Sequence, residues 1–163
     1  MPDRVKPESL TADLFLPWVI VGVMGVMLAA MLVVCISIGE PLQQPLPEDQ
    51  RVLVRTLLYG VAIVTFPMTN LLRHIQLRLN QTMPYAQATP ENIAKKRYLV
   101  TVIVSLSLIE GVGVFGGLMF ILGDNFNSLF IFTGLSALGL FLYRPKAHEY
   151  ASIIDALTAR QHE

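Results

Sequence analysis

The chain has 163 residues, of which 53% are hydrophobic and 15% are charged, with a mean hydropathy of +0.56. Soluble domains carry about 25% charged residues, so this composition excludes an ordinary soluble fold and predicts one domain built in lipid. Twelve basic residues balance twelve acidic ones, which argues against a nucleic-acid partner because such proteins show a basic face. A single cysteine, Cys35, excludes an internal disulfide and a cysteine-based zinc site.

Four apolar segments have the length of about 20 residues that a helix needs to cross a hydrocarbon core of roughly 30 Å. They cover residues 14–38, 52–72, 98–122 and 126–143. Helices satisfy every backbone polar group inside lipid, and these segments lack the alternating pattern of barrel strands. The sequence therefore predicts an all-α membrane protein with a four-helix transmembrane domain over residues 1–145.

A short amphipathic helix is expected after Pro145, within a tail over residues 146–163. Its apolar residues are spaced at i, i+3, i+4 and i+7, which places them on one helical face: Tyr150, Ile153, Ile154 and Leu157. Such a helix either rests on the inner leaflet or docks against a partner protein. The sequence leaves both possibilities open.

The charged residues between the segments predict the orientation of the chain. Residues 73–97 hold five arginines and lysines against one acid, whereas residues 39–51 hold three acids against Arg51. Basic residues close to helix ends stay on the cytoplasmic side of a membrane. We therefore expect the central loop and both termini to be cytoplasmic, in a multi-pass protein of the cell inner membrane.

One acidic residue, Glu110, lies near the middle of the third segment. A charge at that depth costs about 2.5–3.5 kcal/mol, so lipid favours the neutral, protonated carboxyl. No Lys, Arg or His lies at matching depth in the other segments. Ser107, one turn earlier, is a candidate hydrogen-bond partner. Glu110 either bonds across a helix interface, carries a proton or sodium ion, or lines a water-filled cavity.

Small residues predict surfaces where helices approach closely. Gly113 and Gly117 form a small-xxx-small groove beside Glu110. Small residues in the first and fourth segments are also predicted to lie at close contacts between helices: Gly22, Gly25, Ala29 and Gly134. No complete catalytic motif occurs, and no histidine lies inside the four segments. We therefore expect a protein that is not an enzyme and has neither a cofactor nor a metal site.

Residues 107–118, with the sequence SLIEGVGVFGGL, resemble the carboxylate helix of the c subunit, or proteolipid, of rotary ATP synthases. In that family a glutamate at mid-membrane depth is followed by an aliphatic-aromatic-glycine step. The resemblance implies that Glu110 is the ion-carrying carboxylate, with Phe115 and Gly116 at the step. A looser likeness is to the four-helix accessory protein encoded with bacterial ATP synthases, which has an acidic residue in its third helix.

Two functions follow from these patterns. The first is a non-enzymatic accessory or structural subunit of a larger membrane complex, in contact with lipid and with other membrane subunits or further copies of itself. The alternative is an oligomer that translocates protons or sodium ions through Glu110. The small-residue grooves, an exposed amphipathic tail and the lack of a complete catalytic motif favour the first function, and the resemblance favours the second.

Overall fold

The computed structural model describes residues 7–83 and 89–161, and all of its regular elements are helical. Five α-helices follow one another within these described ranges: α1 (Pro7–Ile38), α2 (Glu48–Thr82), α3 (Pro90–Ile121), α4 (Phe126–Leu142) and α5 (Ala147–Gln161). A short 3-10 helix, η1 (Glu40–Leu42), follows α1. The predicted all-α fold is confirmed for the described part of the chain.

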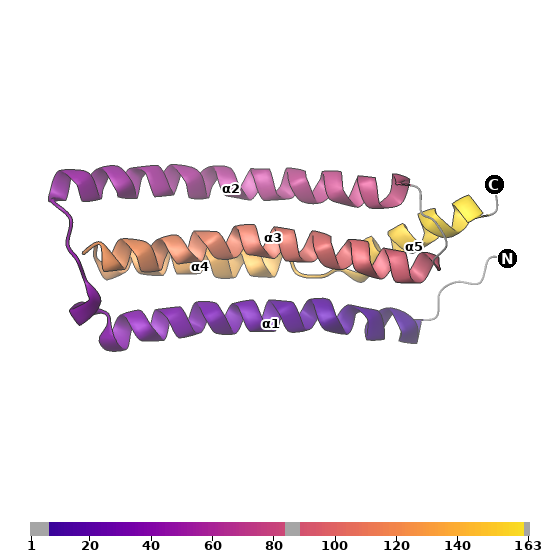
Figure 1. Cartoon of the computed structure of the whole chain (residues 1–163), viewed down its shortest axis with the longest axis horizontal. Helices are drawn as coiled ribbons and strands as arrows, with labels where there is room; N and C mark the ends of the chain where they lie inside the picture. The colour runs from indigo at the N-terminus through magenta and orange to yellow at the C-terminus, as the bar shows by residue number, and fades with distance from the viewer. Residues whose placement is uncertain (1–6, 84–88, 162–163) are drawn as a thin grey trace.

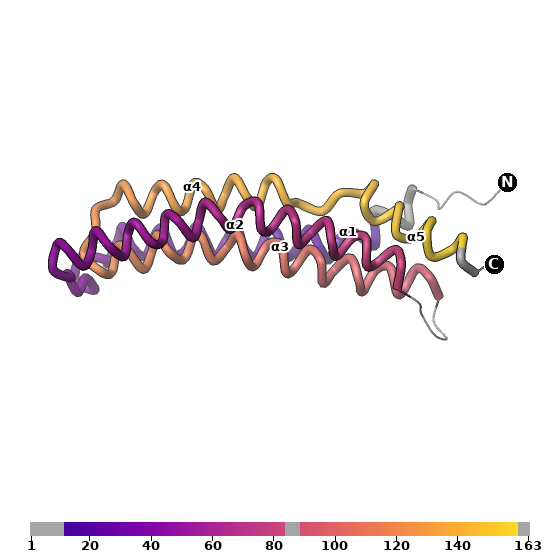
Figure 2. The backbone as a smooth tube through the Cα atoms, turned by 90° about the horizontal axis from the view of Figure 1, so that it is seen from above, coloured from indigo at the N-terminus to yellow at the C-terminus, as the bar shows by residue number. Residues whose placement is uncertain are grey.

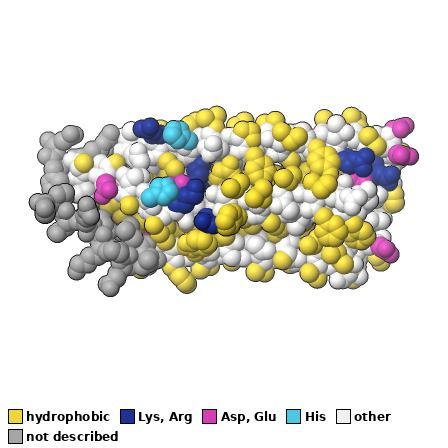
Figure 3. All heavy atoms as spheres, turned by 180° about the vertical axis from the view of Figure 1, so that it is seen from behind, with side chains coloured by type: hydrophobic (Ala, Val, Ile, Leu, Met, Phe, Trp, Pro, Cys, Tyr) yellow, Lys and Arg dark blue, Asp and Glu magenta, His cyan; other side chains and the backbone are white. Residues whose placement is uncertain are grey.

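Three of these helices, α1, α2 and α3, are long and apolar enough to cross a membrane. The fourth candidate span is α4 together with α5, which are bent by 44° relative to each other. On the face shown in Figure 3, hydrophobic side chains fill the middle of the bundle, and charged side chains gather towards its two ends. This distribution fits a protein that lies across a bilayer.

Helix α3 forms the centre of the bundle. It lies between α1 and α2, with α4 behind it (Figure 1), and it contacts each of the other four α-helices. Helices α1 and α3 begin, and α2 ends, at the end of the bundle where α5 lies, which we call the α5 end. Figure 2 shows α4 continuing through a short link into α5 there. The opposite end carries the turn between α3 and α4.

Local sequence explains where the long helices start. Helix α2 begins directly after Pro47, with Glu48 and Asp49 in its first turn, and α3 begins at Pro90, with Glu91 following it. A proline in the first turn costs no hydrogen bond, and acidic side chains there face the positive end of the helix dipole. These proline and acid signals explain why α2 and α3 begin before the apolar segments at residues 52 and 98.

The turn between α3 and α4 is fastened to α2 by charged side chains. Arg55 Nη1 lies 3.1 Å from Asp124 Oδ1, and Ser128 Oγ donates to Asp124 Oδ2 at 2.6 Å. Arg51 Nη1 donates to the carbonyl oxygen of Gly123 at 3.0 Å. Gly123 has φ of +84°, a conformation in which a side chain would be strained. These contacts hold α4 against the bundle at this end.

Helix α5 packs against its own chain. The apolar stripe Tyr150, Ile153, Ile154 and Leu157 is at most 3% exposed, and it joins one core cluster with Ala94, Tyr98 and Val102. The sequence left this stripe open to a leaflet or a partner protein, but α1, α2 and α3 cover it. The bend after α4 turns α5 onto the bundle, and burial of its stripe supplies the hydrophobic driving force.

Candidate functional site

Glu110 lies on α3 at the boundary between its packed and its outward-facing sides. Its side chain is half-buried, and its Oε2 atom is buried without a hydrogen-bond partner among the described residues. On one flank, Leu106 and Gly113 are buried, and on the other, Ile103 and Val114 are exposed. The carboxyl group is therefore desolvated on one side and open towards the surroundings of the bundle on the other.

Ser107 is exposed, and the structure gives no hydrogen bond between it and Glu110, whose Oε2 stays unpartnered. The expected pairing of these two residues is therefore not formed. A spacing of three residues separates side chains by roughly 60° around a helix axis. That rotation takes the serine further onto the outward face.

Helix α1 occupies the groove at Gly113 and Gly117. A Cβ atom at Gly113 would lie 2.5 Å from Leu28 Cδ1, and one at Gly117 would lie 2.9 Å from Met31 Sδ. These glycines allow two parallel helices to approach closely, as small residues do in membranes. The groove beside Glu110 is thus filled by the chain itself.

The small residues on α1 and α4 that were predicted to lie at close helix contacts have more space around them. A Cβ atom at Gly22, Gly25 or Gly134 would meet nothing within 4 Å, and Ala29 is exposed. None of these four positions faces a neighbouring helix closely within the described part of the chain. Helix α1 turns larger side chains such as Leu28 inward, and Gly25 and Ala29 line an open apolar groove between α1 and α4.

No family model, curated protein or solved structure matches this chain.

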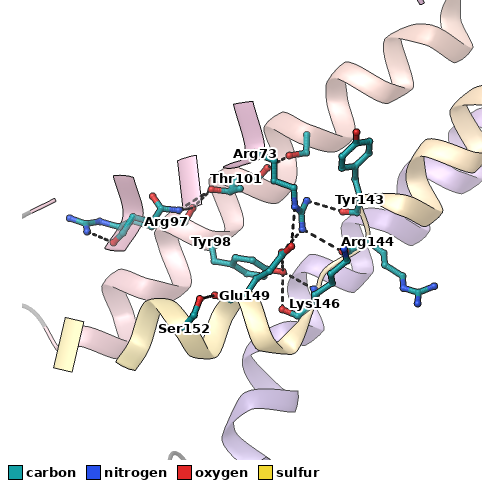
Figure 4. Close-up of polar contacts among 11 residues, drawn as sticks. Arg73, Arg97, Tyr98, Thr101, Tyr143, Arg144, Lys146, Glu149 and Ser152 are labelled. Atoms are coloured by element: carbon teal, nitrogen blue, oxygen red, sulfur yellow. Dashed lines mark hydrogen bonds and ion pairs between the residues drawn. The ribbon is translucent and has the colours of Figure 1, made fainter. Parts of the chain in front are cut away.

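A second polar cluster, which the sequence did not reveal, lies at the α5 end (Figure 4). Arg73 on α2 has a side chain that is only 5% exposed, and its Nη2 lies 2.6 Å from Glu149 Oε2 on α5. Arg73 Nη1 also donates to the carbonyl oxygen of Tyr143 at 2.9 Å. Tyr98 on α3 donates through its hydroxyl to Glu149 Oε2 at 3.2 Å. One carboxylate therefore joins three helices, and we call these residues the Arg73–Glu149–Tyr98 cluster.

The sequence placed Arg73 in a basic loop and Glu149 on the polar face of a tail helix. Arg73 lies inside α2, which extends to Thr82, beyond the predicted end at residue 72. The apolar stripe of Leu71, Leu72, Ile75 and Leu79 indicates that the helix continues past residue 72, but Arg73 lies outside that stripe and is the residue that is buried. Its partner lies 76 residues away, a separation at which helical periodicity carries no information.

Further polar contacts hold α1 and α2 against α3 and α5 at the α5 end. Asp13 on α1 accepts from Lys95 Nζ at 2.8 Å and from the Tyr150 hydroxyl at 2.9 Å. Asn80 Nδ2 on α2 donates to Thr101 Oγ1 on α3 at 2.9 Å. Polar groups at this end thus serve to hold helices together.

Glu110 differs from the other buried acids. Asp124 and Glu149 each pair with an arginine, whereas no cation pairs with Glu110 in the described ranges. No group of three His, Cys, Asp or Glu side chains suited to a metal ion occurs there either. An unpaired carboxyl group within an apolar helix can form a hydrogen bond to a second protein, or can gain and lose a proton.

Proposed function

We propose that this protein is a multi-pass inner-membrane protein that acts, without catalysis of its own, as an accessory or structural subunit of a larger membrane assembly. Its termini lie on the cytoplasmic side in this proposal, as the basic residues between α2 and α3 favour. A helix of another subunit covers the outward side of α3 and pairs with Glu110. The assembly consists of other membrane proteins or further copies of this chain.

The observation that carries the proposal is the buried, unpartnered Oε2 atom of Glu110. An unsatisfied polar group costs several kcal/mol in hydrocarbon, where water cannot replace a missing partner. The chain itself supplies no partner in its described part, although it pairs its other buried acids. A hydrogen bond from a second subunit to the exposed part of this half-buried carboxyl group offsets this cost.

The outward small residues on α1 add support. Gly22 and Gly25 have open space around them, and Ala29 is exposed beside them on the same helix. Small residues on lipid-facing surfaces let a second helix approach closely, with association driven by van der Waals contact. The bundle thus offers a face suited to helix association in addition to the Glu110 side of α3.

Purification in mild detergent tests this proposal through the mass of the intact particle. We expect a particle larger than one chain, which Glu110→Gln preserves because the amide still forms hydrogen bonds. Glu110→Leu is expected to weaken association by about 0.6–2 kcal/mol, the range for a hydrogen bond between membrane helices. Thr56→Leu is the matched control, since Thr56 is exposed on α2 and bonds its own helix backbone.

A monomeric wild-type particle with no co-purifying protein would contradict the subunit proposal. Equal association of the wild type and Glu110→Leu would show that the carboxyl group takes no part in the interface. A similar loss in Thr56→Leu would trace the effect to general perturbation of the bundle.

A second candidate function, proton or sodium translocation, is favoured by the same unpaired carboxyl group. No cation neutralises Glu110 within the described part, so its charge state is free to change as an ion is loaded and released. We expect a carbodiimide to label Glu110 and Glu110→Gln to abolish ion flux into proteoliposomes. Unchanged flux in that variant would rule out this candidate function. If the protein is a structural subunit, we expect both the wild type and Glu110→Gln to assemble.

A further inference from the structure

A cleft at the α5 end has polar walls and lies where α4 ends. It measures about 380 Å³, and it is lined by α2 on one side and by the link from α4 to α5 on the other. We call it the α2–α5 cleft. Its polar lining residues are Asn70, Arg73, His74, Tyr143, Lys146 and Glu149.

Several polar groups at the rim of this cleft have no partner among the residues that the structure describes. Asn70, His74 and Lys146 are exposed, and their side chains form no hydrogen bond or ion pair with other described residues. Arg73 and Glu149, at the base, pair with each other. The ammonium group of Lys146 is therefore the uncompensated charge of the cleft, and His74 and Asn70 add hydrogen-bond donors.

The surroundings of the cleft favour an anion that is attached to an apolar group. Helix α5 begins at Ala147, immediately after Lys146, so the positive end of its helix dipole lies beside the cleft. Leu142 lines the cleft and is 48% exposed, so an apolar group can lie against it. Basic and histidine side chains gather at this end on the face shown in Figure 3, next to the hydrophobic middle of the bundle.

We propose that the α2–α5 cleft binds the phosphate group of an anionic membrane phospholipid. Lys146, His74 and Asn70 contact the phosphate oxygens, while an acyl chain lies along Leu142. Basic pockets between helices at the membrane surface recognise anionic headgroups in this way. The Arg73–Glu149 pair forms a neutral base that shapes the cleft without adding charge. This site is independent of the role of Glu110.

Native mass spectrometry of the delipidated protein in detergent tests the proposal, with phosphatidylglycerol and phosphatidylcholine of the same acyl chains as probes. We expect tighter binding of phosphatidylglycerol to the wild type. Lys146→Gln is expected to weaken that binding about fivefold, the factor that corresponds to one lysine near an anionic headgroup. Lys146→Arg is expected to retain it. Arg78→Gln is the matched control, because Arg78 is exposed on α2 but lies outside the cleft.

Inorganic phosphate distinguishes a lipid from a soluble anion as the ligand. We expect millimolar phosphate to leave phosphatidylglycerol bound, since phosphate lacks the acyl chains that contact Leu142. Displacement by phosphate at that concentration would overturn the lipid assignment. Equal phosphatidylglycerol affinity in the wild type and Lys146→Gln would overturn the site, as would an equal loss in Arg78→Gln. Thermal unfolding of each variant without lipid verifies that its fold is intact.

Discussion

Replacing Arg73 by methionine is expected to lower the free energy of unfolding by about 3–5 kcal/mol, the cost of leaving one member of a buried ion pair without its partner. Glu149 would keep the Tyr98 hydroxyl but would lose its cation. The carbonyl oxygen of Tyr143 would lose a donor as well. Unfolding of the purified protein in mixed micelles measures the change, and limited proteolysis reports whether α5 detaches.

A double variant separates the ion pair from other losses. Arg73→Met combined with Glu149→Met is expected to be less destabilising than the sum of the two single changes, since no buried charge remains unpaired. Arg78→Met is the control on the same helix, because Arg78 is exposed, and it is expected to change stability by less than about 0.5 kcal/mol. If Arg73→Met behaves like Arg78→Met, the cluster does not hold α5 in place.

The second large effect is expected at Gly139 on α4. A Cβ atom there would collide with Cγ2 of Ile109 on α3, and Ile109 is fully buried, so it has no free space to move into. We expect Gly139→Leu to destabilise the bundle by about 1–3 kcal/mol or more through overpacking. Unfolding in mixed micelles again measures the effect.

Helix α4 also provides the matched control for this substitution. Gly134 lies five residues earlier on the same helix, is exposed, and has nothing within 4 Å of a Cβ position. Gly134→Leu is therefore expected to leave the stability of the isolated chain within about 0.5 kcal/mol of the wild type. Similar losses in both variants would mean that glycine at these positions matters for the helix itself and not for its contact with α3.

The helices themselves were largely predictable because their signals are local. Apolar runs set the membrane-crossing parts of α1, α2 and α3, and prolines with following acids set the starts of α2 and α3. Helix α2 extends ten residues past residue 72, where the apolar segment ends, to Thr82. The stripe of Leu71, Leu72, Ile75 and Leu79 predicted that the helix continues beyond its apolar segment, but not where it ends.

Of the candidate site, the sequence predicted only one residue and not the residues that surround it. Glu110 was marked by its depth in an apolar run, but its surroundings depend on how α3 is rotated between α1, α2 and α4. That rotation places Ser107 outward and puts Leu28 over Gly113. The orientation of α1, which turns Leu28 inward, likewise leaves no atom within 4 Å of a Cβ position at Gly22 or Gly25, since one helix can bury only one side against its neighbours.

The sequence by itself determined that this is a helical protein with several apolar segments and one acid in the middle of the third. Hydropathy and helix-start signals act over a few turns, so each helix can be predicted from its own residues. Only the tertiary structure decided that α5 folds onto the bundle, that Arg73 meets Glu149, and that Glu110 has no partner in the described chain. These outcomes depend on contacts between residues far apart in sequence, and the same apolar stripe can be buried equally well by lipid, by a partner or by the chain itself.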